Sequence, residues 1–198
     1  HLVRRLLERG QRVVCLVRPG ESLHRLDGLS VERVEGDLTR PDGLDACLEG
    51  VDTVYHLAAV LGGVPEEYFH RINCGGTRTL VERILRKGRP LQRFLFVSSI
   101  AAVGPSGRGR TNSEQTPCQP VSAYGASKMA AEQYLLGLEE LPVTVVRLPL
   151  VYGPGSDGGL FVFFKMLNRR LKLKFGEGET NVAYVGDVAE GLIRAAQS

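Results

Sequence analysis

A tyrosine and a lysine lie four positions apart in the segment Tyr124-Gly-Ala-Ser-Lys128. In a helix this spacing places the phenol and the ammonium group one turn apart on the same face. Because a nearby cation stabilises a phenolate, we expect Lys128 to lower the pKa of Tyr124 from its ordinary value of about 10. Such a phenol can serve as general acid or base when a carbonyl and an alcohol are interconverted. Taken alone, the pair is equally compatible with an exposed helix face.

Two serines, Ser98 and Ser99, lie at the end of a segment that reads as a buried strand, residues 94–98. Open α/β sheets bind their ligands at the carboxyl ends of their strands. We therefore interpret the two hydroxyls as substrate anchors near Tyr124. The alternative is a serine pair that caps the end of the strand and bonds to loop amides.

The surrounding sequence predicts strands and helices in alternation. Strands are expected at residues 12–17, 31–34, 51–59, 94–98 and 143–148, and helices at 1–9, 66–87 and 122–138, with a short helix ending at Leu48. Such alternation is typical of a parallel sheet covered by helices on both faces. We expect an α/β fold, a Rossmann-type doubly wound parallel sheet over residues 1–152. Residues 153–198 are expected to form a small, irregular substrate-binding region, with a helix near 161–170, an apolar stretch at 171–175 and a last helix from Asp187.

Composition excludes several classes of partner. The 198 residues are 43% hydrophobic with a formal net charge of +3, and the basic residues are scattered, so nothing points to nucleic acid. No apolar run approaches the roughly 20 residues that span a bilayer, so we expect no membrane partner. The four cysteines show neither a CxxC pair nor metal-ligand spacing, so we expect no metal and a reducing, cytoplasmic location.

In their order and spacing, these motifs resemble the extended short-chain dehydrogenase/reductase family, which includes nucleotide-sugar epimerases and dehydratases and dihydroflavonol-type reductases. The resemblance covers the whole chain. It implies that Tyr124 is the catalytic acid/base, that Lys128 lowers its pKa and binds a ribose, and that Ser99 bonds the substrate oxygen. Asn73, in the segment Asn73-Cys-Gly-Gly-Thr77, is implied as a fourth catalytic residue that holds a helix kink and a proton-relay water.

The same resemblance implies a dinucleotide site. Asp37 matches an aspartate that contacts adenine, and residues 56–59 match a segment whose backbone passes beneath the cofactor. Residues 147–154 resemble the loop after the sixth strand, and residues 184–189 match a further family motif. The implied cofactor-binding residues are Asp37, Leu38, Leu57, Ala58, Ala59 and Pro149, together with Tyr124 and Lys128.

Arg18 bears on the choice between NADP and NAD. It directly follows the strand at 12–17, where dinucleotide-binding folds place the group that reads the adenosine ribose. Because an arginine can pair with a 2′-phosphate, Arg18 favours NADP. The alternative is a solvated arginine at the strand end beside Pro19 and Gly20.

Two other features are interpreted as structural. The segment Gly153-Pro-Gly-Ser-Asp-Gly158 fits the glycine fingerprint of dinucleotide folds but leaves too little chain for a Rossmann unit, so we expect a substrate-side loop. His24, His56 and His70 lack carboxylate or cysteine partners at ligand spacing.

Members of the family begin with a strand and a glycine-rich turn that binds the cofactor's pyrophosphate, and neither precedes His1 here. The first strand normally lies between those at residues 12–17 and 51–59. The simplest expectation is that the true N-terminus precedes His1, and that residues 1–198 alone bind NAD(P) poorly.

We expect an NAD(P)-dependent epimerase, dehydratase or oxidoreductase acting on a small molecule with a carbonyl or a secondary alcohol. A non-catalytic dinucleotide-binding or regulatory module stays open, because a fold does not establish activity. A homodimer is also left open. Leu150 stands where nucleotide-sugar members commonly carry a substrate-contacting asparagine, which favours a less nucleotide-like substrate.

Overall fold

The computed structural model describes residues 1–88, 90–107, 109–156, 165 and 180–198. The helix expected near 161–170, apart from residue 165, and the apolar stretch at 171–175 lie outside these residues. The proposed domain boundary at residue 152 stays a prediction. Within the described ranges, no helix is long and apolar enough to cross a membrane.

The strands pair in parallel, as expected for an α/β fold. Strand β1 (Val14–Val17) pairs with β2 (Glu32–Glu35), and β6 (Leu150–Tyr152) pairs with β7 (Val182–Tyr184). The remaining three strands form one sheet in the order β3-β4-β5, with bounds Thr53–His56, Arg93–Ser99 and Val143–Leu148. In this sheet Ser99 at the end of β4 is in register with Leu148 at the end of β5, so the carboxyl ends of the two strands coincide.

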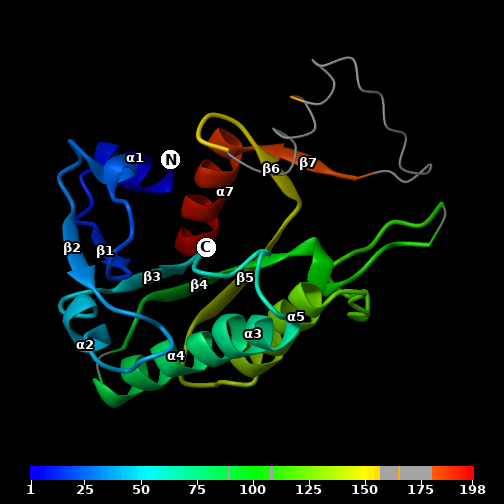
Figure 1. Cartoon of the computed structure of the whole chain (residues 1–198), viewed down its shortest axis with the longest axis horizontal. Coiled ribbons are helices and arrows are strands. Elements are labelled where there is room, and N and C mark those ends of the chain that lie inside the picture. Colours follow the sequence, from blue (N-terminus) through cyan, green and yellow to red (C-terminus); the bar gives the residue numbers. More distant parts are fainter. Residues whose placement is uncertain (89, 108, 157–164, 166–179) are drawn as a thin grey trace.

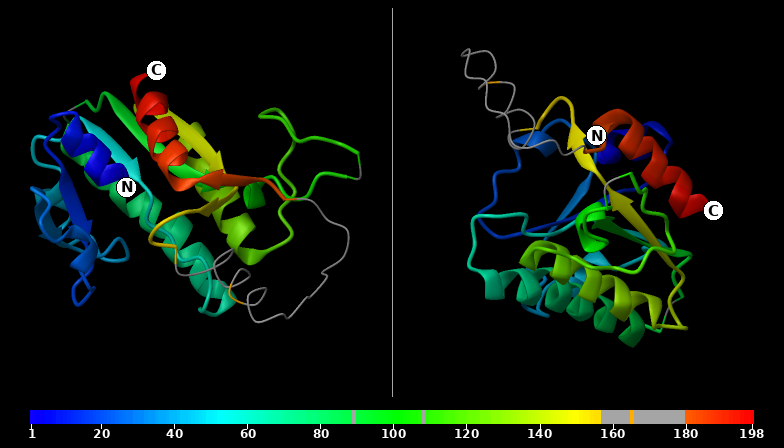
Figure 2. Two further views of the ribbon diagram at one scale, coloured as in Figure 1. Left: turned by 90° about the horizontal axis from the view of Figure 1, so that it is seen from above. Right: turned by 90° about the vertical axis from the view of Figure 1, so that its right-hand side faces the viewer.

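Helices cover both faces of the β3-β4-β5 sheet (Figures 1 and 2). On one face lie α3 (Glu66–Phe69), α4 (Gly76–Arg86) and α5 (Ala123–Leu136), and on the other lie α1 (Leu2–Glu8) and α7 (Val185–Gln197). The short helix α2 (Leu44–Cys47) packs against β1 and α4. A parallel sheet needs cover on both faces because its strands carry apolar side chains on both, so this arrangement confirms the predicted layering.

The core lies between the central strand β4 and the helices α4 and α5. Phe94, Leu95 and Phe96 of β4 are fully buried, and Phe94 and Phe96 belong to the same apolar cluster as Val81 of α4 and Leu135 of α5. Each such side chain contributes roughly 2 to 3 kcal/mol by leaving water. The strand that carries Ser99 is therefore the most firmly held element of the sheet.

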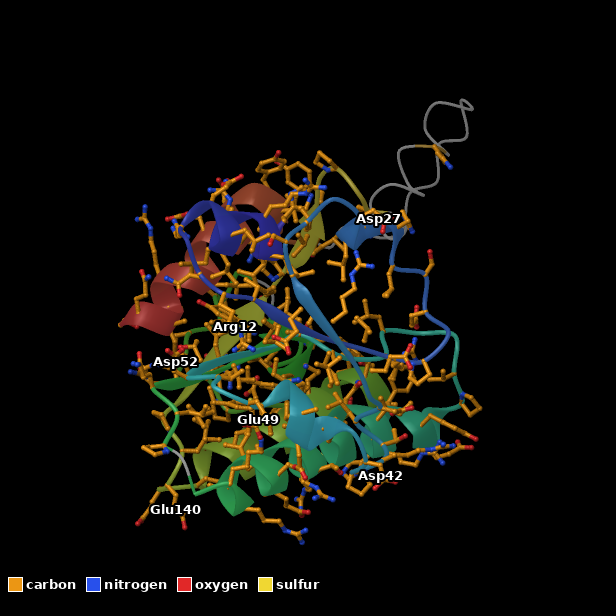
Figure 3. The ribbon with its side chains drawn as sticks, turned by 90° about the vertical axis from the view of Figure 1, so that its left-hand side faces the viewer. Arg12, Asp27, Asp42, Glu49, Asp52 and Glu140 are labelled. Atoms are coloured by element: carbon orange, nitrogen blue, oxygen red, sulfur yellow. The ribbon has the colours of Figure 1, made fainter. Side chains whose placement is uncertain are left out.

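Strands β1 and β3 face each other without pairing: among the described residues no ladder joins them. Near the amino end of β1, Arg12 pairs with Glu32 of β2 and donates to the Glu49 carbonyl at 3.2 Å (Figure 3). Arg12 therefore links the β1-β2 pair to the segment that precedes β3. Arg5 of α1 and Arg9, which caps the end of α1, both pair with Glu190 of α7.

The helix expected over residues 66–87 contains an irregularity that the apolar pattern did not predict. Between α3 and α4 the chain forms a π-helical turn, η2 (His70–Gly75), which includes Asn73. Such turns are rare and occur mostly at functional sites. Periodicity finds the helix but not the turn, because one extra residue barely disturbs a pattern this long.

Candidate active site

Ser99 and Tyr124 are neighbours, and the Ser99 hydroxyl lies close enough to act on the pKa of the phenol. Ser99 ends β4, and its Oγ also accepts from the Ala101 amide at 3.1 Å, so it caps the short helix η3 (Ile100–Ala102) as well. Tyr124 is held by the cap of α5, where Ser122 Oγ accepts from the Gly125 amide at 3.1 Å. The Ser99 hydroxyl therefore satisfies a loop amide, as the capping interpretation expected, and it lies beside the phenol, whereas its role as a substrate anchor stays a prediction.

The close docking of α5 on β4 depends on a residue without a side chain. A Cβ atom on Gly125 would lie 2.2 Å from the Ala101 carbonyl oxygen, closer than real contacts allow. Glycine here lets the first turn of α5 lie against the backbone that follows Ser99. The segment Tyr124-Gly-Ala-Ser-Lys128 thus carries a packing requirement as well as chemistry.

The pKa of Tyr124 differs from the sequence expectation. Burial raises it, and the opposing influence is the hydrogen bond with Ser99 rather than the charge of Lys128. The physical reason lies in the direction of Lys128: its ammonium nitrogen lies 4.0 Å from the centre of the Phe96 ring. Burial therefore favours the protonated form of the phenol in this structure.

Lys128 is itself an unusual residue, because it is only 1% exposed. Burial lowers the pKa of Lys128 to about 8, and the nearby carboxylate of Glu132 opposes this shift. A buried lysine whose pKa lies near the working pH is typical of functional sites.

Asn73 joins two parts of the site. Its Oδ1 accepts from the Val60 amide at 2.8 Å, and its Nδ2 donates to the Val60 carbonyl at 3.1 Å and to Ser127 Oγ at 2.9 Å. Its backbone carbonyl accepts from the Thr77 hydroxyl at 2.6 Å. Asn73 is 1% exposed, and these contacts use both of its side-chain N–H donors and one lone pair of its Oδ1. It lies within η2, the position at which the resemblance implied a helix kink.

Ser98 does not share the position of Ser99. It is 3% exposed, and its hydroxyl is buried without a hydrogen-bond partner. Successive residues of a strand face opposite sides, so only Ser99 reaches Tyr124. The expectation that both hydroxyls reach the same site is therefore wrong for Ser98, and substrate anchoring by Ser99 stays a prediction.

A buried ion pair supports the carboxyl end of the sheet. Arg147 of β5 contacts both carboxylate oxygens of Glu132, from Nε at 3.1 Å and from Nη2 at 2.7 Å. Glu132 is on α5 and its side chain is 3% exposed. This fork holds α5 against β5 one turn beyond Lys128.

The predicted adenosine-binding residues line a cavity of about 720 Å³. Arg18 and Asp37 lie in its wall, with Arg40 and the acidic residues Glu21, Glu35 and Asp42. Asp42 is labelled at the lower right of Figure 3. Two hydrogen bonds from Thr39, both at 2.8 Å, lower the pKa of Asp37, which is therefore an anion able to accept from an adenine amino group.

The other predicted cofactor residues also follow strand ends. Leu57, Ala58 and Ala59 come directly after β3, and the first two are exposed. Pro149 directly follows β5 and is half-buried, whereas Leu38 lies next to Asp37 and packs beside Gly76. The carboxyl ends of five strands therefore carry the predicted set, which is where α/β folds bind dinucleotides. The residues present fit an adenosine at one end and a reacting group beside Tyr124 at the other.

The described part of the glycine-rich segment that begins at Gly153 has a packing role. A Cβ on Gly153 would lie 2.5 Å from the Val185 side chain and 3.1 Å from Tyr184, and its φ is +141°. Glycine here lets β6 approach the start of α7. Gly158 lies outside the described residues.

Sequence reasoning missed three contributors to the site. Thr77 and Ser127 were inside quoted motifs, four residues after Asn73 and one before Lys128, but were given no role. Helical spacing was the signal that could have revealed Thr77, because a threonine bonds readily to the carbonyl four residues earlier. Glu21, which pairs with Arg18, was also missed. The described residues contain no group of three or more potential ligands for a metal ion.

The sequence of this chain is similar to that of a known protein family. The model of the NAD dependent epimerase/dehydratase family matches residues 1–198. Sterol demethylase protein B of Methylococcus capsulatus is 35% identical over 161 residues, 78% of this chain and 48% of that protein. Ceramide reductase of Caulobacter vibrioides is 34% identical, over 82% of this chain and 46% of its own length. The chain thus spans about half the length of these curated relatives.

Solved structures show the same likeness. The crystal structure of the UDP-glucose 4-epimerase of Thermus thermophilus in complex with NAD superposes with a TM-score of 0.86 at 28% identity. The superposition covers 100% of this chain and 70% of that one.

Proposed function

Because the chain belongs to the NAD-dependent epimerase/dehydratase family, we propose that it is the dinucleotide-binding and catalytic part of an NAD(P)-dependent reductase or epimerase. The observation that carries this proposal is the contact between the Ser99 and Tyr124 hydroxyls at the end of β4, with Lys128 one turn further along α5. An intact acid/base pair argues against a purely structural or regulatory module, in which such a buried group has no use.

When bound, the dinucleotide supplies or accepts the hydride. Ser99 donates to the substrate oxygen and orients it toward Tyr124. The protonated phenol of Tyr124 gives its proton to that oxygen as negative charge develops on it, and it recovers the proton in the opposite direction. Lys128 can lower the cost of the phenolate that remains only if its ammonium group leaves the Phe96 ring, over which it lies in this structure, and turns toward the phenol.

We propose a substrate that is less polar than a nucleotide sugar. Leu150 at the start of β6 is 36% exposed, and Ile100 and Leu57, which follow β4 and β3, are 39% and 46% exposed. Apolar side chains there can contact a hydrocarbon skeleton but give no hydrogen bond to a sugar diphosphate. The names of the two relatives above refer to a sterol and to ceramide, which supports this choice.

The cofactor is proposed to be NADP in preference to NAD, through Arg18. In the present structure Arg18 pairs with Glu21, and four carboxylates line the same cavity as two arginines. Preference for NADP therefore requires Arg18 to exchange Glu21 for a 2′-phosphate. The remaining carboxylates of the cavity oppose this exchange, because they repel the 2′-phosphate.

A titration and a substrate panel test these proposals. Quenching or enhancement of NADPH and NADH fluorescence measures binding of each cofactor. A panel of long-chain and polycyclic ketones, with UDP-glucose as comparison, is followed by oxidation of NADPH or NADH or by product analysis. These outcomes refer to the full-length protein. Turnover of an apolar ketone supports the proposal, and turnover of UDP-glucose alone contradicts the substrate class. Binding of neither cofactor contradicts the proposed function.

A further inference from the structure

A chain of buried hydrogen bonds runs from β3 to the π-helical turn. His56 Nε2 lies 2.8 Å from Thr77 Oγ1, and the Thr77 hydroxyl donates to the Asn73 carbonyl at 2.6 Å. A hydroxyl has one proton, and Thr77 donates it to the Asn73 carbonyl. The Thr77 oxygen must therefore accept from the imidazole, so the proton of neutral His56 is on Nε2. His56, Thr77 and Asn73 are 4%, 0% and 1% exposed, so solvent cannot replace any of these partners.

The chain continues from Asn73 to both halves of the site. The carboxamide of Asn73 bonds to both backbone groups of Val60, the residue that follows the cofactor segment 57–59. It also donates to Ser127 Oγ, and Ser127 Oγ donates to the Tyr124 carbonyl at 2.7 Å. The orientation of one side chain thus determines how the cofactor segment lies relative to the helix that carries Tyr124.

We infer that Thr77 is a positioning residue of this site: its hydroxyl, oriented by His56, fixes the backbone of Asn73 and thereby the carboxamide that joins the cofactor segment to the catalytic helix. The effect on turnover rests on the proposed function, whereas the effect on Val60 does not. A π-helical turn departs from the regular backbone bonding of the helix, so a side-chain donor at its carbonyl is needed to hold one geometry.

The state of His56 suits this role. Burial, with the charge of Lys128, lowers the pKa of His56 to about 3, so the imidazole stays neutral and keeps its proton on the nitrogen that faces Thr77. Phe94 and Phe96 pack around the ring, with centroids at 5.8 and 5.6 Å, and limit its rotation. The hydrogen bond between His56 and Thr77 therefore does not change across the pH range in which Lys128 titrates.

Substitution of Thr77 separates hydroxyl chemistry from packing. Thr77→Val keeps the shape and removes the hydroxyl, leaving a buried imidazole proton without its partner and the Asn73 carbonyl without its side-chain donor. Thr77→Ser keeps the hydroxyl and removes a methyl group. Thr79→Val is the matched control, since Thr79 makes the same kind of bond to the Gly75 carbonyl, at 3.1 Å, outside this network.

The direct readout is hydrogen exchange at the Val60 amide, measured by NMR or by mass spectrometry of overlapping peptides. Thr77→Val is expected to speed exchange there by about tenfold or more, the equivalent of one lost buried hydrogen bond. Thr77→Ser and Thr79→Val should stay near wild type. If Thr77→Val does not fold, Ser127→Ala removes the hydrogen bond at the other end of the network, and alanine is well tolerated in a helix. The same faster exchange of the Val60 amide is expected.

Kinetics with a ketone from the panel supply the second readout. We expect kcat of Thr77→Val to fall by about tenfold with the KM for cofactor nearly unchanged, and Thr77→Ser to keep most of the rate. A reversed order, with Thr77→Ser the more damaged in exchange and rate, assigns Thr77 to packing and overturns the inference. A protein that binds neither cofactor contradicts the proposed function but leaves the Val60 measurement decisive for this one.

Discussion

Gly104 and Gln119 are so close that a Cβ atom on Gly104 would lie 2.1 Å from the Gln119 carbonyl oxygen. The Gln119 amide also donates to the Val103 carbonyl at 2.8 Å, so the chain that leaves η3 returns to the same point before it enters α5. This contact fixes both ends of the connection between Ser99 and Tyr124. The two hydroxyls meet because the loop between them is closed at its base.

Gly104→Ala should destabilise the protein for this reason. Gly104 has φ of +90°, where a side chain is strained, and the added methyl group meets a carbonyl that cannot move alone. We expect a loss of about 1 to 3 kcal/mol, seen as a melting temperature lower by several degrees. Gly191→Ala is the control, because Gly191 lies in α7 with open space around it, and it should gain up to about 1 kcal/mol through helix propensity. Equal melting temperatures for the two variants contradict the close contact.

Arg147→Met should be more harmful than loss of an exposed arginine. It leaves the carboxylate of Glu132, which is 3% exposed, without its partner, at a cost of about 3 to 5 kcal/mol. Arg194→Met, which breaks an exposed pair with Glu190, should cost less than about 1 kcal/mol. Chemical denaturation measures both. The double variant Arg147→Met/Glu132→Leu should recover most of the loss, and failure to recover it shows that Arg147 stabilises by something other than this pair.

Glu21→Gln should tighten binding of NADPH and leave binding of NADH nearly unchanged. The substitution frees Arg18 from its ion pair and removes one of the carboxylates in the cavity wall. Arg18→Gln should have the opposite effect on NADPH, weakening it by about tenfold, the value of one charge-assisted contact. Fluorescence titration of both cofactors against both variants gives the result. NADPH affinity that is indifferent to Arg18 removes the basis for preferring NADP.

Lys128 should make stability depend on pH in an unusual direction. Its pKa is about 8 in the folded protein and 10.5 ordinarily, so between these values the unfolded chain binds a proton that the folded protein lacks. Stability therefore rises with pH across this window, by at most about 1.4 kcal/mol per pH unit. Denaturation of wild type and Lys128→Met at pH 7 and pH 9.5 should show wild type gaining relative to the variant. A difference that is constant with pH means that Lys128 titrates normally.

Apolar periodicity was sufficient to predict most of the fold. The strand at 143–148 and the helix capped by Ser122 were located to within two residues, because valine-rich strands and a serine cap are local signals. The order of motifs also predicted a site formed by Ser99, Tyr124 and Lys128, and in the structure Ser99 ends β4 while the other two lie on α5. The roles of these residues remain predictions.

Three-dimensional packing determined what the sequence could not show. Spacing alone placed Lys128 beside Tyr124, but the ammonium lies over Phe96, a residue from another element. Ser98 and Ser99 look equivalent in sequence, yet the pleat of β4 turns them to opposite faces. The link between Asn73 and Ser127 spans residues from two separate helical segments, and no local pattern contains it.

Replacement of Tyr124 by phenylalanine tests the proposed function most directly. The measurement is turnover of the complete enzyme with a ketone from the panel, alongside the dissociation constant of its cofactor. Because general acid/base transfer commonly contributes a factor of about 10² to 10⁴, we expect turnover to fall at least about a hundredfold while the dissociation constant changes by less than about twofold. Retention of most of the activity by Tyr124→Phe would show that the proton comes from another group and would contradict the assignment of this site.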